Sequence, residues 1–137
     1  MSNDSIKDTV FLDLCHSEQI VVEHKDTAAV YGSGSLEVFA TPAMIALMEM
    51  TCLKSVNDKI GEGNTTVGIR VDVSHLKASP VGSVIRCESR IVEVDRRRLV
   101  FEVRCLDVTG SEPVLIGEGR HERFIVESAK FMAKLGS

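Results

Sequence analysis

Thr41, Glu49 and His75 are the residues whose types and spacing best suit acid–base chemistry in this chain. Glu49 is the only acid in the apolar segment 43–53. A carboxylate there is costly to desolvate unless it is paired or protonated, and such perturbed acids are common at functional sites. A histidine can transfer a proton to or from a reacting group, and a hydroxyl can stabilise an oxyanion. Glu49 also has a structural interpretation as a partly exposed acid on an irregular helix, and His75 has one as a structural or surface histidine at a strand end.

A long helix is predicted from Val38 to Lys59, and it would position two of these three side chains. Thr41 fits the N-cap, where its hydroxyl would accept a hydrogen bond from the backbone, and Pro42 suits the first turn. Gly61 can end the helix in a left-handed cap. Because the segment is apolar on nearly all sides, we expect the helix to be buried, and Glu49 with it. Thr41 therefore has a structural interpretation beside its catalytic one.

His75 ends a strand that clean alternation of residue types predicts from Thr66 to His75. Gly68 belongs to the polar row. The apolar row, which should face the helix, consists of Val67, Ile69, Val71, Val73 and His75. Four further strands are predicted, one before the helix and three after it: Gln19–Val22, Ser83–Val94, Leu99–Val108 and Val114–Val126. A short helix from Glu127 to Leu135 should close the chain.

The order of strand, long helix and four antiparallel strands predicts an α+β domain in which a curved sheet wraps one central helix. One such sheet leaves an edge strand or an apolar patch that a second copy would cover, so we expect a homodimer or a dimer of dimers. The segment from His24 to Glu37 reads as a polar, glycine-rich loop with one helical turn at Thr27–Val30. Its length and its place before the helix make residues 27–36 a candidate lid.

The composition is that of a single globular domain spanning residues 1–137, with 44% hydrophobic and 26% charged residues. The net charge of -4 argues against nucleic acid as the main partner, and no apolar run approaches the roughly 18 residues of a membrane span. Met1–Lys7 should form a loose tail and lacks the pattern of a secretory signal. The four cysteines show no paired spacing, which favours reduced thiols and a cytoplasmic location. The four histidines share no metal-ligand spacing, so neither a metal nor another cofactor is expected.

Three runs of residues resemble one subfamily of the hotdog-fold thioesterases, the fluoroacetyl-coenzyme A thioesterases: VFATPAMIALMEMTC, VGIRVDVSHLKASPVGS and GEGRHERFIVESAKFMAKL. The resemblance covers residues 37–135 and implies the hotdog fold, in which a strongly curved antiparallel sheet wraps one long central helix. It also implies that Thr41, Glu49 and His75 form a catalytic set and that Gly68 lies close to the acyl group. The activity it implies is hydrolysis of a small acyl-CoA thioester to the free acid and coenzyme A.

The chain departs from this subfamily just before the helix, in the segment Tyr31–Leu36. Fluoroacetyl-specific relatives place bulky aromatic residues there to gate the pocket, whereas this chain has Ser35 at the last gate position, followed by Leu36. We therefore expect Ser35 and Leu36 to contact the substrate without conferring selectivity for fluorine.

Arginines offer further candidate contacts to the ligand. Arg120, beside Gly119 in the last strand, would help to bind the substrate unless it forms an outward ion pair with Glu118 or Glu122. The arginines at 96–98 would suit the phosphates of coenzyme A, although a solvated hairpin tip is the simpler interpretation.

The chemistry of Glu49 has two possible forms. Its carboxylate would either activate water as a base or attack the thioester directly to form an anhydride. Two other functions suit the same fold. One is a hydratase or dehydratase acting on an acyl thioester, whose Asp-and-His pattern this chain lacks, and the other is a non-catalytic acyl-CoA binding module.

Overall fold

The computed structural model describes residues 11–136, so the predicted tail Met1–Lys7 lies outside the described residues. In chain order it contains β1 (Cys15–Val21), the short 3-10 helix η1 (His24–Asp26), α2 (Ala28–Tyr31), α3 (Thr41–Val56), β2 (Asn64–His75), β3 (Val84–Asp95), β4 (Arg98–Asp107), β5 (Val114–Glu127) and α4 (Ser128–Leu135). Each predicted strand and helix is present, with ends that shift by a few residues. Within 11–136 no helix is both long and apolar enough to span a bilayer.

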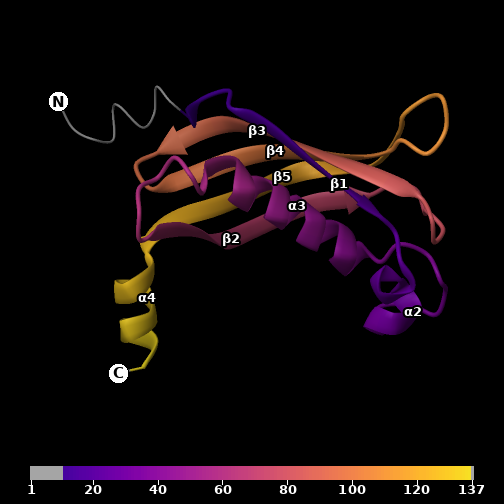
Figure 1. Cartoon of the computed structure of the whole chain (residues 1–137), viewed down its shortest axis with the longest axis horizontal. Coiled ribbons are helices and arrows are strands. Elements are labelled where there is room, and N and C mark those ends of the chain that lie inside the picture. The colour runs from indigo at the N-terminus through magenta and orange to yellow at the C-terminus, as the bar shows by residue number, and fades with distance from the viewer. Residues whose placement is uncertain (1–10, 137) are drawn as a thin grey trace.

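The five strands form one antiparallel sheet in the order β1-β3-β4-β5-β2, so β1 and β2 are its edges. The sheet curves around α3, while α2 lies beside the N-terminal end of α3 and α4 projects from the end of β5 (Figure 1). The predicted α+β arrangement of one sheet around one long helix is confirmed. The edge strand β2 and the helix α4 leave apolar side chains exposed, among them Ile69, Val71, Met132 and Leu135.

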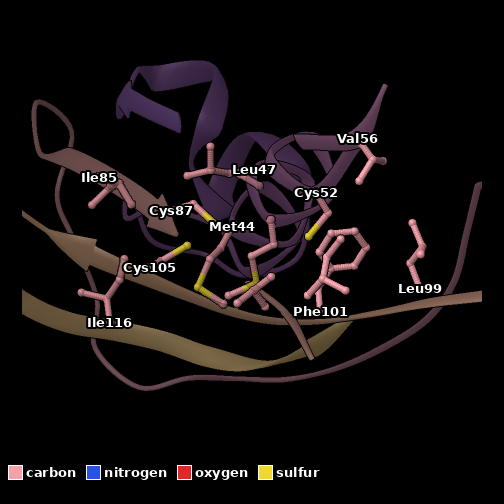
Figure 2. Packing of buried hydrophobic residues seen from close by; sticks show 14 of the residues in the cluster. Met44, Leu47, Cys52, Val56, Ile85, Cys87, Leu99, Phe101, Cys105 and Ile116 are labelled. Atoms are coloured by element: carbon pink, nitrogen blue, oxygen red, sulfur yellow. The ribbon is translucent and has the colours of Figure 1, made fainter. Parts of the chain in front are cut away.

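The core lies between α3 and the inward rows of β3 and β4 (Figure 2). Its main members are Met44, Leu47, Met48 and Cys52 from α3, and Ile85, Cys87, Ile91, Leu99, Phe101, Val103 and Cys105 from the sheet. Alternation in the sequence predicts inward rows for two of the strands, and the structure confirms them. The rows are Ile85, Cys87, Ser89 and Ile91 in β3, and Leu99, Phe101, Val103 and Cys105 in β4. Burial of one large apolar side chain contributes on the order of 1.5–3 kcal/mol to stability. Three of the four cysteines are buried free thiols, as expected.

The start of α3 differs from the prediction. Residues 38 and 39 are extended rather than helical, and the N–H of Phe39 donates to the carbonyl oxygen of Ser79 at 2.8 Å. The helix begins at Thr41 with Ala40 in the N-cap position, and no side chain caps it, so the prediction that Thr41 is the N-cap is wrong. The helix also ends earlier than predicted, and Gly61 lies in the following turn, with a φ of +93°, instead of capping it.

A β-bulge in β2 changes which of its residues face α3. Ile69 is the extra residue, since Gly68 before it and Arg70 after it pair with successive residues of β5. Side chains alternate along a strand, so the extra residue exchanges the two faces. Gly68 consequently faces α3, and the predicted apolar row is wrong for its first two members. Beyond the bulge, Val73 and His75 face α3 as predicted.

Candidate functional site

Thr41 and His75 meet at one end of the sheet. Thr41 is the first residue of α3 and His75 is the last residue of β2, and their Oγ1 and Nδ1 atoms lie 2.8 Å apart, within hydrogen-bond distance. The ring of Phe39 packs edge-on against the imidazole, with ring centres 6.2 Å apart. A cleft of about 300 Å³ opens beside the pair, and Ser33 and Leu76 also line it. The fold therefore places a hydroxyl and an imidazole together at an open cleft.

His75 is held as a neutral imidazole. Burial lowers the pKa of His75 below its ordinary value of 6.5, because the charged form would lose hydration. Its Nε2 atom is buried and has no hydrogen-bond partner among residues 11–136. A buried polar atom without a partner costs stability, and in a native structure it calls for an explanation. Nε2 is thus the nitrogen of His75 that lacks a partner, whereas Nδ1 pairs with Thr41.

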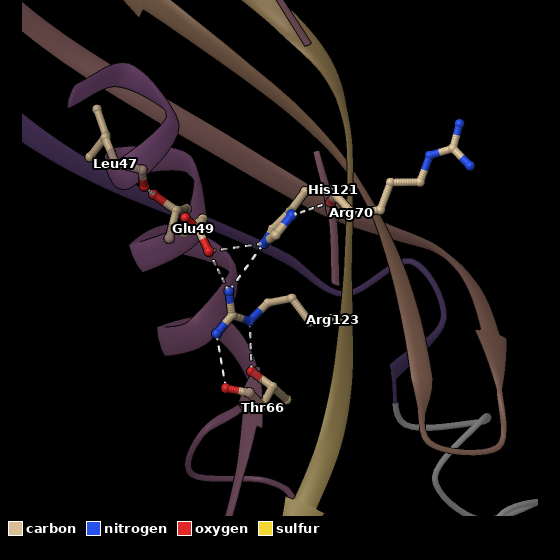
Figure 3. Close-up of polar contacts among 7 residues, drawn as sticks. Leu47, Glu49, Thr66, Arg70, His121 and Arg123 are labelled. Carbon is tan, nitrogen blue, oxygen red and sulfur yellow. Dashed lines mark hydrogen bonds and ion pairs between the residues drawn. The ribbon is translucent and has the colours of Figure 1, made fainter. Parts of the chain in front are cut away.

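Glu49 lies apart from that pair. It follows Thr41 by eight residues on α3, which is roughly 12 Å along the helix axis. Its side chain is 43% exposed, so the prediction that it is buried is wrong. Its Oε2 atom lies 3.4 Å from Nη1 of Arg123 and 3.9 Å from Nε2 of His121 (Figure 3). Within one chain, the structure brings Thr41 to His75 but does not bring Glu49 to either of them.

A buried arginine fixes the direction of the Glu49 carboxylate. Arg123 is only 5% exposed, and its Nε and Nη2 atoms donate to Oγ1 and the carbonyl oxygen of Thr66, at 2.7 and 2.9 Å. Its Nη1 atom donates to Glu49 at 3.4 Å. Burial lowers the pKa of Arg123, but an arginine in a protein stays protonated. Glu49 therefore faces a positive charge whose orientation is set by Thr66.

His121 supports the arginine and is held neutral. Its Nδ1 atom lies 2.7 Å from the carbonyl oxygen of Arg70, which can only accept, so Nδ1 carries the ring proton. Nε2 then accepts a hydrogen bond from Nη1 of Arg123 at 3.1 Å. Burial in the first place, and the charge of Arg123 in addition, lower the pKa of His121. His121 thus serves as an acceptor for Arg123.

Gly68 leaves room for Glu49. A Cβ atom at this position would lie 2.7 Å from Oε2 of Glu49 and 3.2 Å from Cε1 of His121. A contact of 2.7 Å is closer than real Cβ atoms approach, so a side chain at position 68 would displace the carboxylate. Glycine allows the carboxylate to lie directly against the backbone of β2.

Ser35 and Leu36 lie outside the cleft. Both are exposed, Leu36 at 68%, and the loop before α3 reaches the cleft through Ser33. The predicted turn of helix in this loop is present as α2.

Arg120 lies on the face of the sheet away from α3, because it precedes the inward-facing His121. Its guanidinium lies 3.8 Å from the carboxylate of Glu102, so the predicted pairing with Glu118 or Glu122 is wrong. A hollow of about 850 Å³ on this face is lined by Arg120 and by other residues of both charges. Arg120 is therefore separated by the sheet from the groups that face α3.

His121 and Arg123 are site residues that the sequence analysis missed. They belong to the inward row of β5, which also contains Gly119 and Ile125. Two titratable side chains in a core-facing row are a signal, because buried charges are almost always paired. Such a row predicts an acid on the facing helix, and Glu49 is the only acid in α3. Residues 11–136 contain no group of three or more His, Cys, Asp or Glu placed to hold a metal ion.

The chain is similar to known thioesterases in sequence and in structure. Residues 22–129 match the FlK family, described as fluoroacetyl-CoA-specific thioesterase. The fluoroacetyl-CoA thioesterase of Streptantibioticus cattleyicolor is 33% identical over 99 residues, which are 72% of this chain and 68% of that protein. A solved structure of the fluoroacetyl-CoA thioesterase FlK matches with a TM-score of 0.80 at 28% identity, over 90% of this chain and 93% of that one. Structures of FlK variants hold acetyl-CoA, or fluoroacetate and CoA.

A more distant structure shares the fold alone. It is a hot-dog-like protein from Thermanaerovibrio acidaminovorans, with a TM-score of 0.82 at 20% identity over 93% of each chain. The hotdog fold expected from the sequence is thus confirmed. With a family match across most of its length, the chain belongs to the fluoroacetyl-CoA-specific thioesterase family and is a hotdog-fold thioester hydrolase.

Proposed function

We propose that the chain hydrolyses a small acyl-CoA to the free acid and coenzyme A, and that Thr41, Glu49 and His75 carry the reaction. The observation behind this proposal is the Thr41–His75 pair, which lies beside a cleft and whose Nε2 atom has no hydrogen-bond partner among residues 11–136. Glu49, held by Arg123, supplies a group that can activate water. Complexes of the related enzyme with acetyl-CoA support coenzyme A as the carrier of the acyl group. Free thiols support a cytoplasmic location for this single domain.

A homodimer would bring the two separate groups together. β2 is an edge strand, and its residues from Gly68 to Asp72 are exposed. Within this run Ile69 is 52% exposed and Val71 is 42% exposed. An open edge with apolar side chains is a template for pairing with another strand. A twofold dimer would set β2 of two copies side by side and antiparallel.

The register of that pairing determines which residues meet. When the pairing is centred within the exposed run of β2, His75 of one copy lies opposite Gly68 of the other. Neighbouring strands are about 4.8 Å apart, and Glu49 lies directly against Gly68. Each site would then take Thr41 and His75 from one copy and Glu49 from the other, and a dimer would hold two sites.

In the proposed reaction, Glu49 takes a proton from water while the oxygen of that water attacks the thioester carbonyl carbon. The hydroxyl of Thr41 donates a hydrogen bond to Nδ1 of His75. Nδ1 is then the acceptor, and the single ring proton of the neutral imidazole is on Nε2. Nε2 then donates a hydrogen bond to the carbonyl oxygen as negative charge develops there. When the carbon–sulfur bond breaks, the proton on Glu49 passes to the departing thiolate.

The acyl group is proposed to be small and not restricted to fluoroacetyl. The cleft beside Thr41 and His75 measures only about 300 Å³. The residues at the gate position, Ser35 and Leu36, are exposed and lie outside it. Without a bulky gate, discrimination between fluoroacetyl and other short acyl groups should be weak.

Release of free thiol from a panel of acetyl-, fluoroacetyl-, propionyl- and aromatic acyl-CoAs tests the proposed activity. We expect turnover of several short acyl-CoAs, and a loss of kcat of about 100-fold or more in Glu49→Gln and in His75→Ala. Glu102→Gln, on the outer face of the sheet, and His24→Ala, at the exposed start of η1, are the matched controls and should keep full activity. If the folded wild type releases no thiol from any acyl-CoA of the panel, the proposed reaction is overturned. Full activity of either site variant would overturn the residue assignment.

A further inference from the structure

Two arginines at the tip of the β3–β4 hairpin have no acidic partner. Six of the nine arginines of the chain pair with carboxylates: Arg86, Arg90, Arg98, Arg104, Arg120 and Arg123. Among the residues that the structure describes, Arg70, Arg96 and Arg97 make no such pair, and of these Arg96 and Arg97 are adjacent to each other and exposed at the tip. We call Arg96 and Arg97 the tip arginines. Two adjacent, unpaired guanidinium groups are well suited to bind an anion.

The tip arginines border a hollow of about 740 Å³, whose other walls are Asp95, Arg98 and Phe124. The carboxylate of Asp95 lies 3.6 Å from the guanidinium of Arg98, which also pairs with Glu93 and Glu122. The acids at the base of the hairpin therefore gather around Arg98 and leave the tip arginines free. The ring of Phe124 is 38% exposed. The hollow thus combines two free positive charges with an accessible aromatic ring.

We propose that this hollow binds the nucleotide end of the coenzyme A thioester, with the tip arginines on its phosphates and Phe124 against its adenine. The inference rests on the proposed acyl-CoA hydrolase function. Coenzyme A ends in an adenosine that carries a diphosphate and a 3′-phosphate. Guanidinium groups bind phosphate oxygens through two parallel hydrogen bonds, and aromatic rings stack on nucleobases. The hollow offers both kinds of contact.

The hairpin also lies at a suitable distance from the proposed site. It forms one end of the sheet, away from the end of β2 that carries His75 (Figure 1). Gly68 on β2, Arg123 on β5 and Leu99 on β4 are partners across adjacent strands. Phe124 and its cross-strand partner Arg98 lie on the face of the sheet away from α3, since Phe124 follows the inward-facing Arg123. In the proposed dimer, His75 of the second copy lies opposite Gly68, so three strand spacings, about 14 Å, separate it laterally from the strand that begins at the hairpin. The pantetheine arm of coenzyme A would therefore pass around the end of the sheet to bring the phosphates to the hollow.

A kinetic test compares one acyl group on two carriers, coenzyme A and N-acetylcysteamine, which lacks the phosphates and the adenine. The double variant Arg96→Asn, Arg97→Gln removes both tip charges. Asparagine suits position 96, where φ is +59°. We expect KM for the acyl-CoA to rise about tenfold or more, with kcat unchanged, because charge-assisted hydrogen bonds to phosphate are lost. The N-acetylcysteamine thioester should be hydrolysed as by the wild type.

The matched control is the double variant Arg86→Gln, Arg104→Gln, which removes two charges from the outer face of the sheet. It should leave the kinetics of both substrates unchanged. An unchanged KM for the acyl-CoA in the tip variant would overturn the inference. A rise in KM of equal size in the control, or for both carriers, would also overturn it, because it would show a general effect of charge or folding.

A binding measurement separates this inference from the proposed hydrolysis. Calorimetric titration with coenzyme A, 3′-dephospho-coenzyme A and pantetheine needs no turnover. The affinity of the wild type should fall from coenzyme A to 3′-dephospho-coenzyme A to pantetheine. The tip variant should bind all three ligands with similar affinity. Phe124→Leu should weaken binding of both ligands that contain adenine. If the protein hydrolyses no acyl-CoA but its affinity for coenzyme A depends on the tip arginines, only the hydrolase function is rejected. If the wild type and the tip variant bind coenzyme A with equal affinity, the nucleotide site is rejected.

Discussion

Arg123 is the residue on which the position of Glu49 depends. Its planar guanidinium contacts Thr66, His121 and Glu49 at once, which the single ammonium group of a lysine cannot do. We predict that Arg123→Lys lowers kcat for an acyl-CoA about tenfold or more with little change in KM, because the charge remains but the carboxylate is misplaced. Urea denaturation should show a loss of about 1–3 kcal/mol in the free energy of unfolding, since the carbonyl of Thr66 loses its buried donor.

The control for this variant is Arg104→Lys, which changes an exposed arginine of the outer face and should alter neither kcat nor stability. If Arg123→Lys lost stability but kept its kcat, Arg123 would be a structural residue without a role in placing Glu49.

Buried His121 and half-buried His75 make stability depend on pH. Burial lowers the pKa of His121 and the pKa of His75 below 6.5, so the folded protein holds both of them neutral. As the pH falls through about 6.5, the unfolded chain binds protons at these positions before the folded chain does, and the free energy of unfolding decreases. We predict that this decrease, measured by urea denaturation between about pH 7.5 and 5, is smaller in His121→Gln than in the wild type. His24→Gln, at an exposed position, should retain the wild-type pH dependence, and a wild-type slope in His121→Gln would contradict the prediction.

At the scale of single residues, the sequence predicted which side chains belong to the polar groups more reliably than it predicted the contacts of those side chains. The sequence placed Thr41 and His75 toward one pocket. It predicted that the hydroxyl of Thr41 caps the helix, whereas in the structure this hydroxyl lies within hydrogen-bond distance of His75. It placed Glu49 in a buried helix because apolar residues surround that position in the chain. The exposure of Glu49 depends on the open edge of the sheet beside it, which the composition of the helix cannot reveal.

At the scale of elements, alternation predicted the inward rows of β3 and β4 because both are central strands with a neighbour on each side. It failed in the first half of β2, where the bulge at Ile69 arises from pairing with β5 and has no signature in the sequence of β2 alone. The prediction of where α3 begins was wrong for a related reason. Phe39 suits a helix by its apolarity, but a backbone hydrogen bond to Ser79 holds it in extended conformation.

The bulge makes Gly68 a test of how closely Glu49 must approach β2. Gly68→Ala would place a methyl group 2.7 Å from Oε2 of Glu49, and the partly exposed carboxylate can move aside. We therefore predict a folded protein whose free energy of unfolding stays within about 1 kcal/mol of the wild type. Its kcat should fall about tenfold or more because the carboxylate is displaced. Gly110→Ala, where nothing lies within 4 Å of the added Cβ, is the control. Full kcat in Gly68→Ala would mean that Glu49 does not act from its position beside β2.

At the scale of the whole molecule, one edge strand connects the two separate groups of polar residues. His75 ends β2, whereas Glu49 lies against Gly68 in its first half. Antiparallel pairing of two such strands reverses this order in the second copy, so each end of the pair would receive one group from each chain. The predicted need for a second copy and the separation of Glu49 from His75 thus have one explanation. The sequence alone could not reach it, because eight residues on one helix still allow a shared pocket.

Mixing two inactive variants tests whether the site is shared between copies. Glu49→Gln and His75→Ala each lack one contribution, but a heterodimer of the two would contain one site in which both contributions are intact. Random exchange of chains makes half of the dimers heterodimers, each with one working site of two, so refolding the variants together should restore about a quarter of the wild-type activity. Variants that are refolded separately and mixed immediately before the assay are the control and should show none. If native mass spectrometry detects heterodimers but activity stays absent, each site must take Glu49 and His75 from the same chain, since every chain in the mixture then carries one defect.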